Sequence, residues 1–453
     1  LAFRNERRLF RRPCSATGRQ IISIFPENSP YKVLANEVWW GSSWDARDFG
    51  RSYDFSRPFF EQFRELHRDI PKQALIATNN ENSDYVNYAL NCRDCYLLLG
   101  WGENNEHCMY GRLVVGCRDC IDISNARDCE LCCHSTDIST CYRLFYSQSC
   151  KQCSDSWYLK NCLACSDCFG CINLSHRRYC IFNEQYSRED YDLRLKAMRE
   201  KLRHPPEHAR LEKEIDERFS HAPHKYYQGM NTEQSTGDYL TNCKNCFRCF
   251  DTVESEDSAY LYDCIQTRCC RDLSVAGKNR TEMSYQCVNY TGYHCLFVSL
   301  VWLSSDLIYC QDCFQNTHDC FGCSGLKQAS HCILNKQYPP QEYQCLCRKI
   351  IEQMQENGEW GHFFPASLAP YAYNDSMAQE YYPLSAAEAR SAGYDWRDDD
   401  AEEPSHTNAA SLPLPASPRD FRPEMLGTAW TCEATGRGYK INSGELKFYV
   451  EHE

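Results

Sequence analysis

The chain has 453 residues, of which 42% are hydrophobic and 25% charged, an ordinary composition for a protein large enough to hold several domains. Its formal net charge of −13 argues against nucleic-acid binding over the whole surface, but it leaves room for a local basic patch. No stretch approaches about 18 consecutive apolar residues, so no membrane-spanning helix and no membrane partner are expected. Cysteine is the exception, because 33 of them, an odd number, cannot all pair within one chain.

The first 80 residues are rich in arginine and aromatic residues. In the segment RNERRLFRR, arginines stand at helical spacing, so a helix would gather them on one face, beside Phe3 and Phe10 for stacking. This pattern predicts a nucleic-acid site, and the alternative is pairing with an acidic segment of the same or a neighbouring chain. The predicted site comprises Arg4, Arg7, Arg8, Arg11 and Arg12.

One long segment occurs twice in the sequence. DCFGCINLSHRRYCIFNEQY (167–186) matches DCFGCSGLKQASHCILNKQY (319–338), and DYVNYALNCRDCY (84–96) matches DYLTNCKNCF (238–247). Repetition over this length indicates a duplicated domain.

The first copy also carries a finer period of 21 residues, in which cysteine exchanges with aliphatic residues, as expected of inward-facing positions. The clearest series are Cys108, Cys129, Cys150 and Cys171, and Cys117, Ile138, Leu159 and Cys180. With β-prone segments between them, the period predicts coils of a parallel β-helix, and an array of zinc knuckles is the alternative. The predicted fold is mainly β: two tandem cysteine-rich parallel β-helix (solenoid) domains with α-helical connectors and small zinc-ribbon-like ends.

Helices are expected to connect and cap these domains. Ser187 and Asp190 stand at N-cap spacing before one helix, a second begins near Pro205, and a third, after the second copy, ends at Gly358. The aromatic segment after it would cover an open solenoid end, and an acidic, proline-rich linker follows. The predicted divisions are 1–80, 84–186, 187–231, 232–338, 339–396, 397–424 and 425–453.

Most Cys-x-x-Cys pairs are explained by the interior columns, but two features point to metal. CLACSDCFGC places four thiols within ten residues, a set that fits zinc or, as a second choice, an iron–sulfur cluster: Cys162, Cys165, Cys168 and Cys171. CSATGRQII at Cys14 and CEATGRGYKI at Cys432 both have the form of a zinc knuckle. In each, a threonine (Thr17, Thr435) stands where the second cysteine of a knuckle is expected. One thiol cannot close a metal site, so either other cysteines complete it or the fold keeps the shape without the metal.

Several segments together resemble an uncharacterised family of cysteine-rich proteins that is abundant in the candidate-phyla-radiation (Patescibacteria) bacteria. They are RNERRLFRRPCSATGRQIIS, DFGRSYDFSRPFFEQF, GEWGHFFP, AQEYYPL and both DCFGC segments. The resemblance covers nearly the whole chain and implies zinc-ribbon-like modules around the cysteine repeats, with no established activity. Relatives extend further at both ends, which suggests head-to-tail self-association through two half-ribbons; trimmed ends are the alternative.

The sequence favours a structural, scaffolding or protein-interaction protein over an enzyme, because it contains no Walker A, GxSxG, HExxH or dinucleotide-binding motif. The alternatives are a zinc or iron–sulfur protein with a storage or redox role, and nucleic-acid binding through the basic N-terminus. Carbohydrate processing by Asp251, Glu254, Glu256 and Asp257 is a further alternative, by analogy with other β-helix proteins. Without a signal-like apolar opening, and with cysteine exchanging for aliphatics, a cytoplasmic location is expected rather than secretion, unless a segment upstream is missing.

Overall fold

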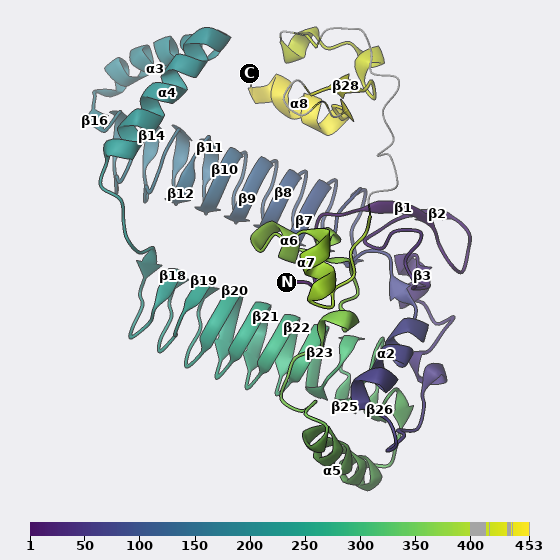
Figure 1. Cartoon of the computed structure of the whole chain (residues 1–453). Coiled ribbons are helices and arrows are strands. Elements are labelled where there is room, and N and C mark those ends of the chain that lie inside the picture. Colours follow the sequence, from purple (N-terminus) through teal and green to yellow (C-terminus); the bar gives the residue numbers. More distant parts are fainter. Residues whose placement is uncertain (399–413, 416, 433–435, 437, 453) are drawn as a thin grey trace. The chain divides into compact units, whose positions relative to one another are not determined.

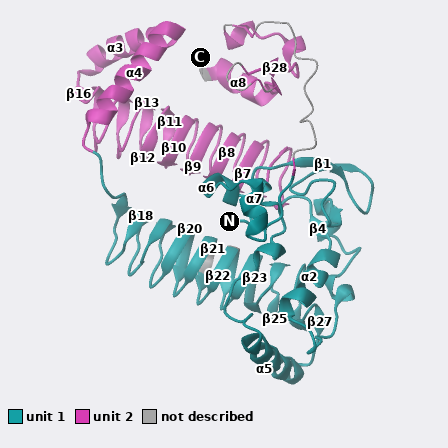
Figure 2. Ribbon diagram, viewed as in Figure 1, with its two compact units in different colours: residues 1–75, 224–397 teal, residues 76–223, 398–453 magenta. Residues whose placement is uncertain are grey.

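The computed structural model describes residues 1–398, 414–415, 417–432, 436 and 438–452. The chain forms two compact units, one of residues 1–75 and 224–397 and the other of residues 76–223 and 398–453 (Figure 2). The N-terminal segment therefore belongs with the second sequence repeat, which the repeat pattern alone did not indicate. Most of the linker predicted at 397–424 lies outside the described residues.

The first sequence repeat forms a long sheet whose strands follow one another in nearly the order of the chain; we call it the first ladder (Figure 1). All of its pairings are parallel except the last, where the chain reverses. Its strands are β5 (Ala77–Thr78), β6 (Ala89–Leu90), β7 (Tyr96–Glu103), β8 (Met109–Val115), β9 (Ile121–Arg127), β10 (Cys133–Ser139), β11 (Tyr142–Phe145), β12 (Gln148–Lys151), β13 (Ser154–Trp157), β14 (Ser166–Phe169), β15 (Arg178–Ile181) and β16 (Glu184–Gln185).

The second repeat forms an equivalent sheet, the second ladder, which is also parallel up to its final reversal. Its strands are β17 (Gly229–Met230), β18 (Gly237–Thr241), β19 (Cys249–Val253), β20 (Ala259–Arg268), β21 (Arg271–Glu282), β22 (Tyr285–Tyr293), β23 (Leu296–Ile308), β24 (Gln311–Phe314), β25 (His318–Phe321), β26 (Ser330–Ile333) and β27 (Lys336–Gln337). The described structure is thus mainly β, as predicted.

The repeating length of the first ladder is 12 residues, and the predicted 21-residue coil is wrong. Ile121 pairs with Cys133, and Ser154 pairs with Ser166. From Cys117 to Cys171, every third side chain is buried. Since 21 is a multiple of three, the 21-residue series connects buried positions on different sides of the ladder, which explains why cysteine exchanges with Ile138 and Leu159.

The same three-residue rhythm appears in the backbone. The residue before each buried position has a positive φ near 50°, as at Asp119, Asp128 and Asp137. This left-handed conformation is unfavourable for most residues and least so for Asn and Asp, which explains why these types recur there. Each left-handed residue turns the chain, so four triplets complete one 12-residue segment.

Both ladders end in the same way, at the repeated DCFGC and Asn-x-Gln-Tyr motifs. The side chain of Asn183 brackets the backbone of Ile172, accepting from its N–H and donating to its carbonyl, both at 2.9 Å. Asn335 brackets Ser324 in the same way. Gly170, at φ +63°, lies against the ring of Phe182, where a Cβ would clash. The motif is therefore the terminus of a ladder.

The helices of the connector pack on the end of the first ladder. Ser187 caps α3 (Arg188–Leu202) by accepting from the N–H of Asp190, and α4 (Pro205–His221) begins at the predicted proline. Tyr191, Leu211 and Ile215 of these helices share a core with Tyr158, Phe169 and Ile181 of the ladder. In the same unit are 3₁₀ turns at Pro418–Asp420 and Pro423–Met425, the hairpin of β28 (Trp430–Thr431) and β29 (Gly438–Tyr439), and α8 (Ser443–His452).

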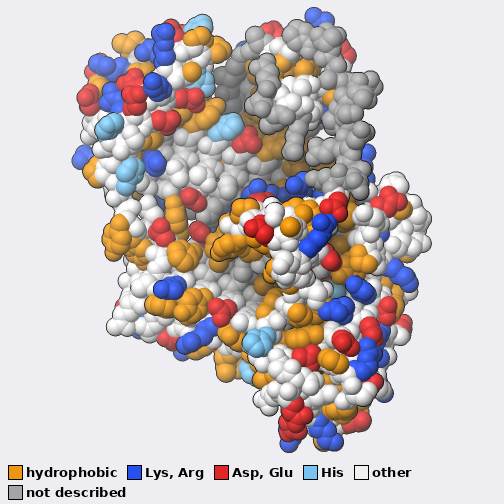
Figure 3. All heavy atoms as spheres, in the orientation of Figure 1, with side chains coloured by type: hydrophobic (Ala, Val, Ile, Leu, Met, Phe, Trp, Pro, Cys, Tyr) orange, Lys and Arg blue, Asp and Glu red, His pale blue; other side chains and the backbone are white. Residues whose placement is uncertain are grey.

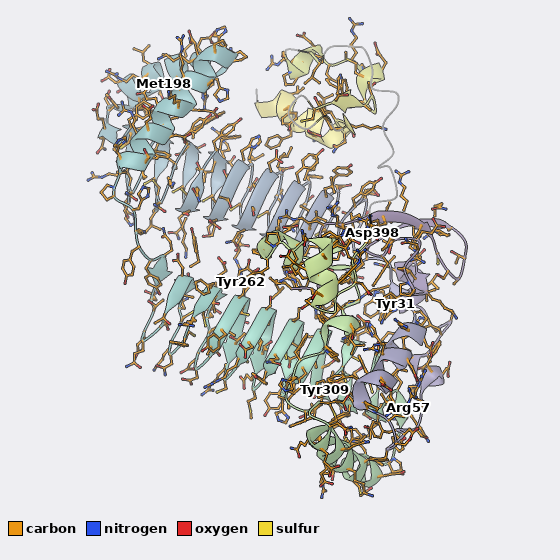
Figure 4. The ribbon with its side chains drawn as sticks, viewed as in Figure 1. Tyr31, Arg57, Met198, Tyr262, Tyr309 and Asp398 are labelled. Atoms are coloured by element: carbon orange, nitrogen blue, oxygen red, sulfur yellow. The ribbon has the colours of Figure 1, made fainter. Side chains whose placement is uncertain are left out.

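The N-terminal segment and residues 339–397 cover the end of the second ladder. Phe59 contacts Tyr309 and Phe321 of the ladder, with ring centroids 5.4 Å apart in both cases (Figure 4 labels Tyr309). The elements involved are β1 (Phe10–Pro13), β2 (Gln20–Ser23), β3 (Val33–Leu34), α1 (Asn36–Trp40), a 3₁₀ turn (Ala46–Phe49), α2 (Phe59–Asp69), β4 (Lys72–Gln73), α5 (Pro340–Glu356), 3₁₀ turns at Ala366–Leu368 and Tyr373–Asp375, α6 (Ala378–Tyr381) and α7 (Ala386–Ser391). Among the described helices, none is long and apolar enough to cross a bilayer.

Candidate functional site

Most of the cysteines are interior groups of the ladders. All 33 are free thiols, and all are buried except Cys269, Cys345, Cys347 and Cys432. A ladder thiol donates to the carbonyl two residues earlier, as Cys120 does to Arg118 at 3.2 Å, and accepts from the N–H twelve residues later, as Cys120 does from Cys132 at 3.4 Å. Cysteine thus fills a narrow core and satisfies backbone groups with one small side chain.

Serine takes the same role at other interior positions. Ser135 donates to the carbonyl of Cys133 at 3.0 Å and accepts from the N–H of Ser147 at 3.2 Å. The interchange of Cys and Ser shows what the position requires: a small side chain that can both donate and accept. Thiol reactivity is not needed for this role.

The predicted metal quartet lies on successive interior positions of the first ladder, and its thiols point to different carbonyls. Cys162 donates to Lys160, Cys165 to Leu163, Cys168 to Ser166 and Cys171 to Phe169, at 3.2–3.4 Å. Over the described part of the chain, no group of three or more His, Cys, Asp or Glu side chains is arranged to hold a metal ion. As placed, the four residues do not fit a metal, and zinc and iron–sulfur stay predictions.

The surroundings shift the pKa values of the quartet's thiols in different directions. Burial raises the pKa of Cys165 to about 12, and a hydrogen bond with Cys171 raises the pKa of Cys168. Cys162 is the exception, because a hydrogen bond with Cys150 lowers its pKa.

The two knuckle-like segments have the same hairpin geometry. Pro13 pairs with Gln20 and Thr431 with Gly438, so each hairpin closes around a cysteine that follows its first strand. The N–H of Gly18 donates to the carbonyl of Cys14 at 2.9 Å, and Gly436 donates to Cys432 at 2.8 Å. The structure does not describe residues 433–435, which include Thr435, or residue 437. The head-to-tail completion of these hairpins stays a prediction.

The Cys14 thiol is surrounded by hydrogen-bond donors. Burial raises its pKa, but hydrogen bonds from the Thr17 hydroxyl and from the backbone N–H groups of Ala35, Ala16 and Thr17 outweigh burial and lower it to about 7. The Ala35 N–H lies 3.3 Å from the sulfur. Thr17 stands where the second cysteine of a knuckle is expected, and it is a hydrogen-bond partner of Cys14.

The predicted arginine helix does not exist. Residues 10–13 form strand β1, and Arg4 is buried beside Glu6 and the Ser274 hydroxyl. Arg12 is also buried and donates to the carbonyl of Pro26. The pattern failed because the segment is held by contacts with distant residues rather than by local helix propensity. Of the predicted nucleic-acid site, Arg7, Arg8 and Arg11 keep exposed or half-exposed side chains, and binding through them stays a prediction.

Each ladder carries an outward column of alternating charge. In the first ladder the paired residues are Glu81, Arg93, Glu106, Arg118, Glu130 and Tyr142, and in the second they are Glu233, Lys244, Glu256, Arg268, Glu282 and Tyr293. Within each of these columns, no two paired residues carry the same charge, which favours the parallel register. The carboxylates considered for carbohydrate processing contribute to such contacts: Glu256 pairs with Arg268 at 3.8 Å, and Asp257 accepts from Asn245 at 2.9 Å.

A second outward column of the first ladder is apolar and is covered by α8. Met109, Ile121, Cys133 and Phe145 form one core with Phe448 of the helix. Beside this column the rings of Tyr96 and Tyr110 meet edge to face, 5.7 Å apart at 85°. The Tyr110 hydroxyl donates to Glu445 of α8 at 2.8 Å.

The equivalent face of the second ladder is open among the described residues. The alignment of the charge columns equates Tyr96 with Phe247 and Tyr110 with Tyr260, and these rings also meet edge to face, 5.7 Å apart at 86°. Phe247 is 48% exposed and Tyr260 is 45% exposed. Figure 3 shows hydrophobic side chains gathered on the visible surface around β18–β20. We call the exposed residues Phe247, Arg248, Tyr260 and Arg271 the open face.

Comparison of the sequence with protein-family models and with curated proteins finds no match. The candidate site therefore depends on the geometry of this chain alone. The open face was not predicted, because it is recognised only when the two ladders are aligned through their strand register. The signal was available in the aromatic residues that occupy matched positions of both copies.

Proposed function

We propose that this protein is a scaffolding or protein-interaction protein built on two cysteine-rich parallel β-helices, and that the open face of the second ladder binds a helix of a partner protein. In this interpretation, each 12-residue segment is one coil of a solenoid. The coil interiors use thiols and hydroxyls to satisfy the backbone, so the outward columns are left to carry function.

The observation that carries the proposal is the unequal use of one face in two matched ladders. The same edge-to-face aromatic pair is present in both, and among the described residues only the pair of the first ladder is covered by a helix, α8. Exposed aromatic rings of this kind mark interaction sites on soluble proteins. The first ladder thus supplies a template for what the second ladder binds.

The charge of the open face defines the chemistry of the partner helix. Arg271 takes the place of Ile121, and the Arg248 guanidinium lies 5.4 Å from the Phe247 ring. A helix that contacts this face must offer aromatic side chains to the rings and carboxylates to the arginines. We therefore expect an acidic amphipathic helix that resembles α8, whose Phe448, Tyr449 and Glu445 make the corresponding contacts in the first ladder.

The test uses the full chain and a fluorescent synthetic peptide with the α8 sequence, residues 443–452, followed by anisotropy. The wild-type protein should bind the peptide, and Phe247→Ala should weaken binding by at least about tenfold, since central aromatic residues dominate such interfaces. The matched control is Tyr226→Ala, which removes an aromatic side chain that is 98% exposed outside the face. It should leave the affinity unchanged.

Two outcomes would contradict the proposal. The first is equal affinity of wild type and Phe247→Ala, because the peptide would then bind elsewhere, for instance by displacing α8 from the first ladder. The second is concentration-dependent self-association in sedimentation that Phe247→Ala abolishes while the peptide does not bind. That result would make the occupant a second copy of the chain rather than a partner helix.

A further inference from the structure

A buried polar cluster connects the N-terminal segment with the second ladder. The Lys72 ammonium group lies 2.9 Å from a carboxylate oxygen of Asp312 and 3.0 Å from Nδ1 of His67. The Ser324 hydroxyl lies 3.1 Å from the same Nδ1. His67 and Lys72 are only 2–3% exposed. His67 belongs to α2 and Lys72 to β4, so the cluster is not part of the repeated interior pattern of the ladders.

The contacts fix the protonation of His67. An ammonium group can only donate, so Nδ1 must accept and the ring proton must lie on Nε2. Burial, aided by the charge of Lys72, lowers the pKa of His67 well below its usual value, so the ring is neutral. Within the described residues, Nε2 has no hydrogen-bond partner. A buried donor without a partner is unfavourable, and a bound acceptor would satisfy it.

His67 forms part of the wall of a cavity of about 190 Å³. The other walls come from the loop after β2, from Arg64 and Arg68 of α2, and from residues 367–372 and 395–397; Tyr31, labelled in Figure 4, belongs to the loop. A space of this size suits a small ligand. Burial raises the pKa of Tyr31 to about 12, so its hydroxyl remains a donor at neutral pH.

The charged groups of the cavity leave positive charge in excess. Arg397 pairs with Asp375 through two short contacts, at 2.8 and 2.9 Å, so these two groups neutralise each other. Asp395 remains as one carboxylate against the guanidinium groups of Arg64 and Arg68. Arg64 donates to Ser367 at 2.7 Å, yet its Nε is buried without a partner among the described residues.

We propose that this cavity is a binding site for a small oxyanion, a phosphate or carboxylate group, that accepts from Nε2 of His67 and pairs with Arg64 and Arg68. Guanidinium groups suit such ligands because their donors match two oxygen atoms at once. Lys72, Asp312 and Ser324 position the imidazole and do not themselves contact the ligand.

Isothermal titration of the full chain with inorganic phosphate, with acetate and with chloride at constant ionic strength tests the site. Phosphate or acetate should bind with one site per chain, chloride should not, and the stronger of the two identifies the ligand class. In nuclear magnetic resonance spectra, the ring proton signals of His67 should shift with the same saturation curve. This second readout needs no variant.

Arg68→Gln is the informative substitution, because Arg68 is exposed and the fold does not depend on it. It should weaken binding at least about tenfold. Lys32→Gln removes the same charge from a nearby exposed residue that does not line the cavity, and it should change affinity less than twofold. Equal weakening by both variants, binding of phosphate no tighter than chloride, or a His67 signal that does not move would each overturn the proposal.

Discussion

The side chain of Asn335 makes two hydrogen bonds to one residue: it accepts from the N–H of Ser324 at 2.9 Å and donates to the Ser324 carbonyl at 2.7 Å. The same group also donates to the carbonyl of Ala46 at 3.0 Å. Asn335 therefore ends the second ladder and attaches the N-terminal segment to it.

Replacing this asparagine should destabilise the second ladder more than the same change in the first. Asn335 is fully buried, whereas Asn183 is exposed. Asn335→Ala leaves buried backbone groups without partners and should cost about 2–4 kcal/mol, against about 1 kcal/mol for Asn183→Ala. Hydrogen exchange of amides in the last strands of each ladder measures both effects. Equal loss of protection in the two variants would be inconsistent with the difference in burial.

Interior cysteines should tolerate serine better than valine. Cys120 donates to the Arg118 carbonyl and accepts from the Cys132 N–H. Serine can make both contacts, as Ser135 does, while valine makes neither and leaves that N–H unpaired at a cost of about 1–3 kcal/mol. Urea denaturation of Cys120→Ser and Cys120→Val checks the order, with Val114→Ile at another interior position as a control for added volume. A valine variant as stable as the serine variant would show that the hydrogen bonds of the thiol contribute little.

Acid should destabilise the unit that contains His67. The pKa of His67 is lowered by burial and by Lys72, so below about 6.5 the unfolded chain binds a proton that the folded chain does not. Stability is therefore retained above this pH and falls as the pH decreases, by up to about 1.4 kcal/mol per unit. Thermal unfolding at pH 7.5 and 5.5 should show a smaller pH effect in His67→Gln than in wild type.

His224→Gln is the control for this pH effect, because His224 is exposed. That variant should keep the full wild-type response between the two pH values. If His67→Gln retains the wild-type response as well, the acid sensitivity comes from other groups and the buried neutral state of His67 is wrong.

How much the sequence could predict depends on the range of the interactions involved. The duplication and the Ser187 helix cap were readable because they are local or repeated patterns. The period was misread because 21 and 12 are both multiples of three. The Cys108, Cys120 and Cys132 series, spaced by 12, already held the shorter period.

What remained out of reach depends on contacts between distant segments. Arg4 is buried against Ser274, and Lys72 is paired with Asp312; neither relationship leaves a trace in local spacing. The same holds for the attachment of residues 1–75 to the second ladder, which rests on packing such as that of Phe59 against Phe321. Periodicity identifies which side chains of a ladder are interior, but not which segment covers its end.

Counting thiols by mass spectrometry after alkylation, before and after unfolding without reductant, tests most directly whether the cysteines are interior structural groups. The native protein should react quickly only at Cys269, Cys345, Cys347 and Cys432, and unfolding should release all 33 thiols for reaction. Rapid native labelling of Cys120 or Cys165, a total below 33 after unfolding, or metal released in proportion to the thiols would contradict it.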